Sequence, residues 1–108
     1  MALGDLDDHG RFSDPSLLVM SSLADGPKHG YEIATHLKER SAGFFSLSFG
    51  ALYPILHKLE KEGLVAGTWV ERRKTYELTK AGKAALADER ERHDELVGAF
   101  ARLRGKKA

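Results

Sequence analysis

The segment at residues 48–64, SFGALYPILHKLEKEGL, constrains the fold of this chain more than any other. Its apolar residues recur with the i, i+3, i+4, i+7 spacing of a helix that buries one face. The stripe consists of Leu52, Ile55, Leu56 and Leu59. Ser48 can cap the start of this helix and Gly63 can close its end. Pro54 removes one backbone donor, but the stripe runs through it without a change of phase, so we predict a helix with an irregular first turn.

The opposite face of this helix carries side chains that are suited to contacting a partner. They are Tyr53, His57, Lys58 and Lys61. Polar side chains on a helix can read base edges in the major groove of DNA, and lysines there can meet phosphates. A solvated face of an ordinary amphipathic helix would look the same, so the helix alone leaves both interpretations open.

A hairpin is predicted directly after the helix. Residues 64–70 and 74–79 are rich in β-branched and aromatic side chains, and residues 71–73 (ERR) join them. That joint contains neither Gly nor Asn, so its turn type is left open. We expect Trp69 to pack on the strand face near Tyr76. A helix followed by a short basic hairpin is the layout of a winged helix-turn-helix.

Two helices are predicted before this unit. Asp14 and Pro15 form a good start for the first one, since a carboxylate can accept a backbone N–H and proline lacks one. Residues 17–24 are apolar nearly all round the helix, which indicates burial on several sides and points to a second chain. The segment 29–40, HGYEIATHLKER, has one apolar stripe and forms the second helix. Some apolar side chains of the connector at 44–49 should fill the gap between this helix and the next.

The last helix is predicted to run from a cap at Thr79 to about Leu103, and it carries a heptad-like seam. Two polar residues, Glu89 and His93, interrupt that seam. The helix has nothing in its own domain to pack against along its full length, so we predict a homodimer. The predicted dimer contacts are Leu17, Leu18, Met20, Leu86, His93, Leu96, Val97, Phe100 and Leu103.

Charge and composition exclude several classes of protein. The net charge is only +1, so an affinity for nucleic acid must depend on where the basic residues lie. Because the chain has no cysteine, it has neither a disulfide framework nor a thiolate zinc site, and no pair of histidines at i, i+4 indicates a metal site. The sequence contains no phosphate-binding glycine loop and no nucleophile elbow, so we predict neither an enzyme nor a cofactor.

The apolar runs and the ends of the chain bear on its location and its organisation. No apolar run approaches the roughly 20 residues that span a bilayer, and the start MALGDLDD is too acidic for a signal peptide. We therefore predict a soluble, cytoplasmic protein without a membrane partner. Its predicted parts are a flexible arm at 1–12, a winged helix-turn-helix at 13–79, a dimerisation helix at 80–104 and a basic tail at 105–108.

Three motifs, in this order, resemble those of the PadR-like transcriptional regulators of bacteria. They are HGYEI at residues 29–33, GALYPILHKLEKEGL at 50–64 and KTYELTKAG at 74–82. The resemblance implies an α+β, mostly α fold: a winged helix-turn-helix whose single C-terminal helix packs against the N-terminal helix of a partner. It also implies a homodimeric repressor that binds an inverted-repeat DNA operator and is released by a small-molecule effector.

The same resemblance nominates contacts for DNA and for an effector. The DNA contacts are Ser48, Gly50, Tyr53, His57, Lys58, Lys61, Arg72, Arg73 and Lys74. Gly50 fits either a close approach to a phosphate or a packing contact. The effector candidates are His93 and Phe100, and His93 stands where some small members of the family carry a tryptophan. Two alternatives are a winged-helix module that binds another protein and a ligand-sensing dimer without DNA binding.

Overall fold

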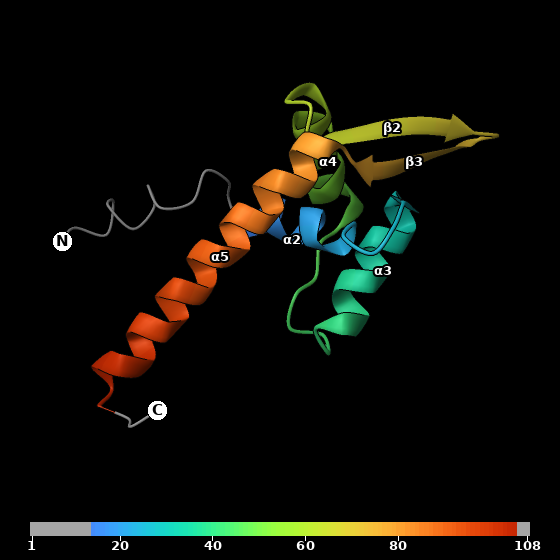
Figure 1. The fold of residues 1–108 in the computed structure, drawn as a ribbon. Coiled ribbons are helices and arrows are strands. Elements are labelled where there is room, and N and C mark those ends of the chain that lie inside the picture. Colours follow the sequence, from blue (N-terminus) through green and yellow to red (C-terminus); the bar gives the residue numbers. More distant parts are fainter. Residues whose placement is uncertain (1–13, 106–108) are drawn as a thin grey trace.

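The computed structural model describes residues 14–105, which form four helices and a three-stranded sheet (Figure 1). The helices are α2 (Asp14–Ser22), α3 (Gly30–Arg40), α4 (Phe49–Lys61) and α5 (Lys80–Leu103). The strands are β1 (Lys28–His29), β2 (Val65–Val70) and β3 (Arg73–Leu78). The predicted arm at residues 1–12 and most of the predicted tail at 105–108 lie outside the described part of the chain.

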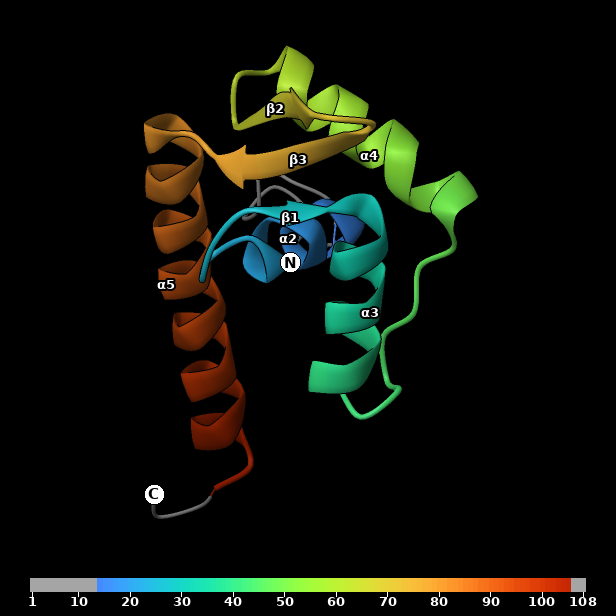
Figure 2. The same cartoon turned by 90° about the vertical axis from the view of Figure 1, so that its right-hand side faces the viewer.

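The core lies where α2, α3 and α4 meet the sheet and the start of α5 (Figure 2). From α4 it receives the fully buried Leu52, Leu56 and Leu59, with Ile55 half-buried beside them. The predicted stripe is confirmed, and so is the mostly helical winged helix-turn-helix fold. The other core residues are Val19, Met20, Leu23, Ile33, Leu37, Val65, Tyr76, Leu78 and Leu86.

The ends of α4 and the start of α5 are defined by the residues that the sequence indicates. Ser48 Oγ accepts a hydrogen bond from the Ala51 N–H (3.2 Å), and Thr79 Oγ1 accepts one from the Gly82 N–H (3.0 Å). Gly63 ends α4 with a φ of +79°, a left-handed conformation that glycine adopts without steric cost. These local signals therefore place α4 and α5 correctly in the chain.

Pro54 lies inside α4 without interrupting it, so the irregular first turn that we predicted is wrong. The N–H that proline lacks would have bonded to the carbonyl of Gly50, four residues earlier. Gly50 is exposed, so water can reach this end of the helix and replace the lost donor.

The wing is a two-residue hairpin, shorter than predicted. β2 and β3 pair antiparallel up to Val70 and Arg73, so Arg73 is the first residue of β3 and not part of the turn. Glu71 and Arg72 make the turn, and Glu71 has a φ of +59°. Residues other than glycine adopt the left-handed region only at a steric cost, which explains why the residues of this turn carry no clear turn signal.

The sheet has a third strand that the sequence did not predict. β1 pairs antiparallel with β3 in the register Lys28–Tyr76 and His29–Thr75, which gives the strand order β1-β3-β2. A strand of two residues is too short to show an alternating pattern. This strand matters for the site because it ties the start of α3 to the wing.

Only the first half of α5 packs against the body of its own protomer, and the second half extends away from it (Figures 1 and 2). Leu86 and Glu89 are buried, whereas Phe100 on the same stripe is 56% exposed. Two predicted dimer contacts must therefore be corrected. Met20 and Leu86 belong to the core of the protomer and are not available to a partner. Glu89 also lies inside the protomer, 3.4 Å from the Arg92 guanidinium.

The connector between α3 and α4 fills the gap between these helices less than expected. Leu47 packs against the core, but Phe44 is 82% exposed and forms an edge-to-face pair with Phe45 at the surface. Ala42 and Gly43, with φ values of +54° and +83°, turn the chain at the end of α3. The apolar character of a loop does not determine its path, because the backbone turn before it sets the direction.

Candidate nucleic-acid interface

The outer face of α4 is exposed along its whole length, as the sequence predicted. Tyr53, His57, Lys58 and Lys61 all point away from the core, since the opposite face of the helix is buried. Gly50 is exposed as well, and a side chain there would meet only Ser48 Oγ, at 3.9 Å. Gly50 is therefore not a packing glycine, and the interpretation as an open approach at the start of α4 is the one that the geometry favours.

A groove of about 960 Å³ lies between α4, the start of α3 and the wing. Tyr53 contributes from α4, Tyr31 from α3, and Trp69, Arg72 and Arg73 from the hairpin. Aromatic rings and guanidinium groups are the side chains that stack on bases and bind phosphates. Residues that are far apart in the sequence thus form one aromatic and basic surface.

A row of aromatic rings crosses from α3 to α4 at this surface. The ring centroids of Tyr31 and Phe49 are 6.2 Å apart, and those of Phe49 and Tyr53 are also 6.2 Å apart. The Tyr53 hydroxyl lies over Gly30, where an added Cβ would come within 2.6 Å of it. We did not predict Tyr31 or Phe49 as site residues. The HGYEI motif contained Tyr31, but nothing local to the motif showed that its ring faces α4.

Trp69 lies on the same face of the sheet as Tyr76, as expected from their register, but it does not pack there. Trp69 pairs with Lys74 and Gly67 pairs with Tyr76, so all four residues share one face. Tyr76 is buried, whereas Trp69 is 67% exposed. The Trp69 ring is therefore available at the edge of the groove.

Lys74 forms an ion pair within the protein, although the sequence nominated it as a DNA contact. Its Nζ lies 2.9 Å from Glu60 Oε1 and 5.3 Å from the centre of the Tyr76 ring. Gly67 leaves the room for this pair, because a Cβ at that position would come within 2.3 Å of Lys74 Cε. The hydrogen bond lowers the pKa of Glu60 and raises the pKa of Lys74, and burial raises the pKa of Tyr76. We therefore leave Lys74 out of the DNA contacts.

The ion pair predicts how the stability of the protein depends on acid pH. Lys74 holds the pKa of Glu60 below its ordinary value of 4.5, so the folded state binds this proton less readily than the unfolded chain does. The resulting stabilisation is present above pH 4.5 and is lost as the pH falls through the folded-state pKa. Glu60→Gln should therefore lose less stability than the wild type between about pH 6 and about pH 3.5.

Urea unfolding at both pH values measures this difference, and Glu77→Gln is the matched control. Glu77 is an exposed glutamate on β3, beside the wing. The control should retain the acid dependence of the wild type. If Glu60→Gln retains it too, the Glu60–Lys74 pair does not contribute to stability in solution.

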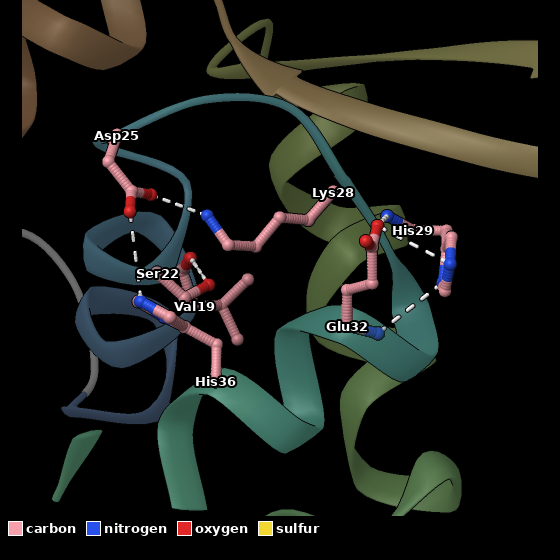
Figure 3. A network of polar contacts seen from close by, with 7 residues as sticks. All are labelled: Val19, Ser22, Asp25, Lys28, His29, Glu32 and His36. Carbon is pink, nitrogen blue, oxygen red and sulfur yellow. Dashed lines mark hydrogen bonds and ion pairs between the residues drawn. The ribbon is translucent and has the colours of Figure 1, made fainter. Parts of the chain in front are cut away.

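The start of α3 forms a second polar cluster next to the groove (Figure 3). His29 caps this helix: its imidazole Nδ1 accepts a hydrogen bond from the backbone N–H of Glu32 (3.3 Å), and the backbone N–H of His29 donates to Glu32 Oε1 (3.0 Å). Farther along, Asp25 pairs with Lys28, which lowers the pKa of Asp25, and its other carboxylate oxygen lies 3.9 Å from His36 Nε2. These contacts fix the chain between α2 and α3.

The remaining candidate residues lie on the distal half of α5, away from this groove. Their side chains are exposed and continue the stripe of Leu86 and Glu89 along the helix. They are His93, Leu96, Val97, Phe100 and Leu103. Within residues 14–105 no cluster of three potential metal ligands is found, and no helix of this part is long and apolar enough to cross a membrane.

Comparison with known proteins provides the context for this geometry. The model of the transcriptional regulator PadR-like family matches residues 19–88. The negative transcriptional regulator PadR of Bacillus subtilis (strain 168) is 34% identical over 84 residues, which are 72% of this chain and 46% of that protein. The transcriptional regulator Rv3488 of Mycobacterium tuberculosis is 33% identical over 85 residues, which are 75% of this chain and 77% of that protein.

The similar structures include a complex with DNA. It is the crystal structure of Bacillus subtilis PadR in complex with operator DNA, with a TM-score of 0.63 and 31% sequence identity. The match covers 68% of this chain and 44% of that one. This chain thus spans less than half the length of the Bacillus subtilis protein.

Proposed function

Because this chain belongs to the PadR-like family of transcriptional regulators, we propose that it is a repressor that binds an inverted-repeat DNA operator as a homodimer. α4 enters the major groove, and the wing contacts the neighbouring backbone through Arg72 and Arg73. The contacts from α4 are Ser48, Gly50, Tyr53, His57, Lys58 and Lys61. The observation that carries this proposal is the groove that Tyr53 of α4 lines together with Arg72 and Arg73 of the wing.

The distal half of α5 supports the proposed dimer. Its apolar stripe continues past the body of the protomer, and no described residue of the same chain covers it. A two-fold axis near this stripe would let each protomer cover the stripe of the other. The half-buried Leu17 and Leu18 of α2 are the remaining predicted contacts. To enter successive major grooves, the two α4 helices must lie about 34 Å apart.

We also propose that a small molecule releases the repressor by binding between the α5 helices. His93 and Phe100 lie two helical turns apart on the exposed stripe, so both would face the dimer seam. An effector that binds better to a dimer with a different α4 spacing must weaken DNA binding. By linkage, it lowers the affinity for DNA by the same factor by which DNA lowers the affinity for the effector.

The principal alternative is a module that binds another protein through the same groove. Contacts to phosphates release counterions, so the affinity for DNA falls steeply with salt. The exposed arginines of the wing favour DNA over a protein partner. A ligand-sensing dimer that has lost DNA binding would bind small molecules but no genomic fragment.

Tyr53→Ala and Arg73→Ala should each weaken DNA binding without changing the fold. Arg73→Ala removes a charge-assisted phosphate contact, so we expect a loss of about ten- to a hundredfold and a salt slope that is smaller by about one. Tyr53→Ala removes an aromatic contact in the groove, and we expect a loss of about tenfold. The measurement is a gel-shift titration at several salt concentrations, on fragments selected from genomic DNA of the source organism.

Arg90→Ala is the control for the loss of positive charge. Arg90 is exposed on α5, outside the groove, so its removal should leave the affinity within about twofold of the wild type. If Arg73→Ala and Arg90→Ala have the same effect, the wing does not contact DNA. If the wild type binds no fragment at any salt concentration, the proposed function is wrong.

A further inference from the structure

His29 lies at the junction of α3 and the wing. Its backbone belongs to β1 and pairs with Thr75 of β3, while its imidazole caps α3 by accepting the Glu32 N–H at Nδ1 (3.3 Å; Figure 3). The imidazole is only 20% exposed. One residue thus connects the first turn of a helix with a strand of the hairpin.

The second ring nitrogen of His29 meets the wing. Arg73 Nη1 lies 3.1 Å from His29 Nε2, across 44 residues of sequence. A guanidinium can only donate hydrogen bonds. Two donors therefore point at the two nitrogens of one imidazole, the Glu32 N–H at Nδ1 and the Arg73 N–H at Nε2.

A neutral imidazole has one acceptor nitrogen, so it can satisfy only one of these two donors at a time. With the proton on Nε2, the ring caps α3 and can donate to Glu32 Oε1, which lies 3.4 Å from Nε2. With the proton on Nδ1, the ring accepts from Arg73 and the cap is lost. The ring tautomer therefore links the capping of α3 to the position of Arg73.

We propose that His29 is a positioning residue for the wing, which holds Arg73 beside α3 in the free protein and releases it to a DNA phosphate. When a phosphate oxygen accepts from Arg73, the proton of the imidazole moves to Nε2 by exchange with water, and Nδ1 caps α3. The exchange conserves charge, because one proton leaves Nδ1 and one arrives at Nε2. This inference rests on the proposed function, because the phosphate that takes Arg73 is assumed to be that of DNA. The competition between the two tautomers does not itself depend on DNA.

The size of the coupling is limited by the two contacts that compete. A helix cap changes an equilibrium by about two- to thirtyfold. We therefore expect His29 to change the DNA affinity by about three- to tenfold, less than the direct loss of Arg73. An effect of this size is small for a binding site but large enough to measure in a titration.

The first test is the tautomer of His29 in the protein without DNA. The ¹⁵N shifts of the ring nitrogens in the labelled protein, at about pH 8 where an ordinary imidazole is neutral, report which nitrogen carries the proton. Arg73→Ala should move the proton population of His29 toward Nε2, while the signals of His36 stay unchanged. If Arg73→Ala leaves the His29 shifts unchanged, Arg73 does not compete for the ring and the proposal is wrong.

The second test is a double-mutant cycle on the selected DNA fragments. His29→Asn keeps an oxygen that can cap α3 but removes the ring nitrogen that faces Arg73. We expect this variant to keep the unfolding midpoint of the wild type and to bind DNA about three- to tenfold more tightly, because no contact with His29 then has to be broken before Arg73 reaches the phosphate. Arg73→Ala should then cost more in the His29→Asn background than in the wild type, where the lost phosphate contact is partly offset by the lost competing contact with His29. Additive effects of the two substitutions would overturn the positioning role and leave DNA binding by Arg73 intact, whereas a wild type that binds no DNA would overturn the proposed function alone.

Discussion

Phe100→Asp is expected to convert the proposed dimer into monomers. Phe100 is 56% exposed on the distal half of α5, and it lies about 16 Å along the helix axis from the buried Glu89. A carboxylate at this position would have to be buried between two helices without a partner charge, which costs several kcal/mol, of the order of the free energy that holds a small dimer together. Light scattering over a range of concentrations should give the mass of one chain.

Loss of the dimer should also remove most of the affinity for an inverted repeat. The second α4 of a dimer binds at an effective concentration set by its tether to the first, which raises the affinity by about 10²–10⁴-fold. Phe100→Asp should therefore weaken binding to the full operator by at least about a hundredfold, and a single half-site should bind the variant and the wild type alike.

Gly98→Asp is the matched control for this substitution. Gly98 lies on the other side of α5, and a Cβ there would meet only Arg102 Nη1, at an ordinary distance of 3.6 Å. The control introduces the same carboxylate two residues away and should remain dimeric. A dimeric Phe100→Asp, or a monomeric Gly98→Asp, would show that the seam does not follow the stripe of Phe100.

Gly82→Ala is expected to destabilise the fold by about 3 kcal/mol or more, in spite of the higher helix propensity of alanine. A Cβ at Gly82 would lie 2.0 Å from the carbonyl oxygen of Leu64, and this contact is with the backbone, which cannot rotate away. Gly82 allows the first turn of α5 to approach the end of α4, where Thr79 Oγ1 donates a hydrogen bond to the Gly63 carbonyl (2.7 Å). The substitution must push this junction apart.

Thermal or urea unfolding measures the effect, and Gly98→Ala is the control in the same helix. The surroundings of Gly98 have room for a methyl group, so the control should gain up to about 1 kcal/mol from helix propensity. A loss of about 3 kcal/mol should lower the Tm of a domain of this size by about 10 °C or more. If Gly82→Ala is as stable as the wild type, α5 does not approach Leu64 as closely as described.

The parts of the fold that follow from local sequence were predicted well. The stripe of α4 and the caps at Ser48 and Thr79 each depend on residues within a few positions of one another. Gly63 ends α4 because it alone in that turn adopts a positive φ without cost. These signals set the bounds of the helices and the mostly helical winged fold before any tertiary contact is known.

The errors concern contacts between residues that are distant in sequence. Lys74 was predicted to face DNA but pairs with Glu60, 14 residues earlier. The register places Lys74 opposite Trp69, and the missing side chain of Gly67 on the same face leaves room for Lys74 to reach Glu60. Met20 and Leu86 were predicted at the dimer seam but are buried within the protomer. An apolar side chain has the same sequence signature in either place, since burial against its own chain and burial against a partner are the same transfer out of water.

The sequence by itself determined the three motifs, the helices that carry them and the family, because hydrophobic period and capping act within one turn of the chain. Only the tertiary structure decided that Tyr31, Tyr53 and the wing arginines share one groove and that His29 meets Arg73. These contacts depend on how β1 pairs with β3 and on how α3 crosses α4. Such packing is set by the shape of the whole core, which no short segment encodes.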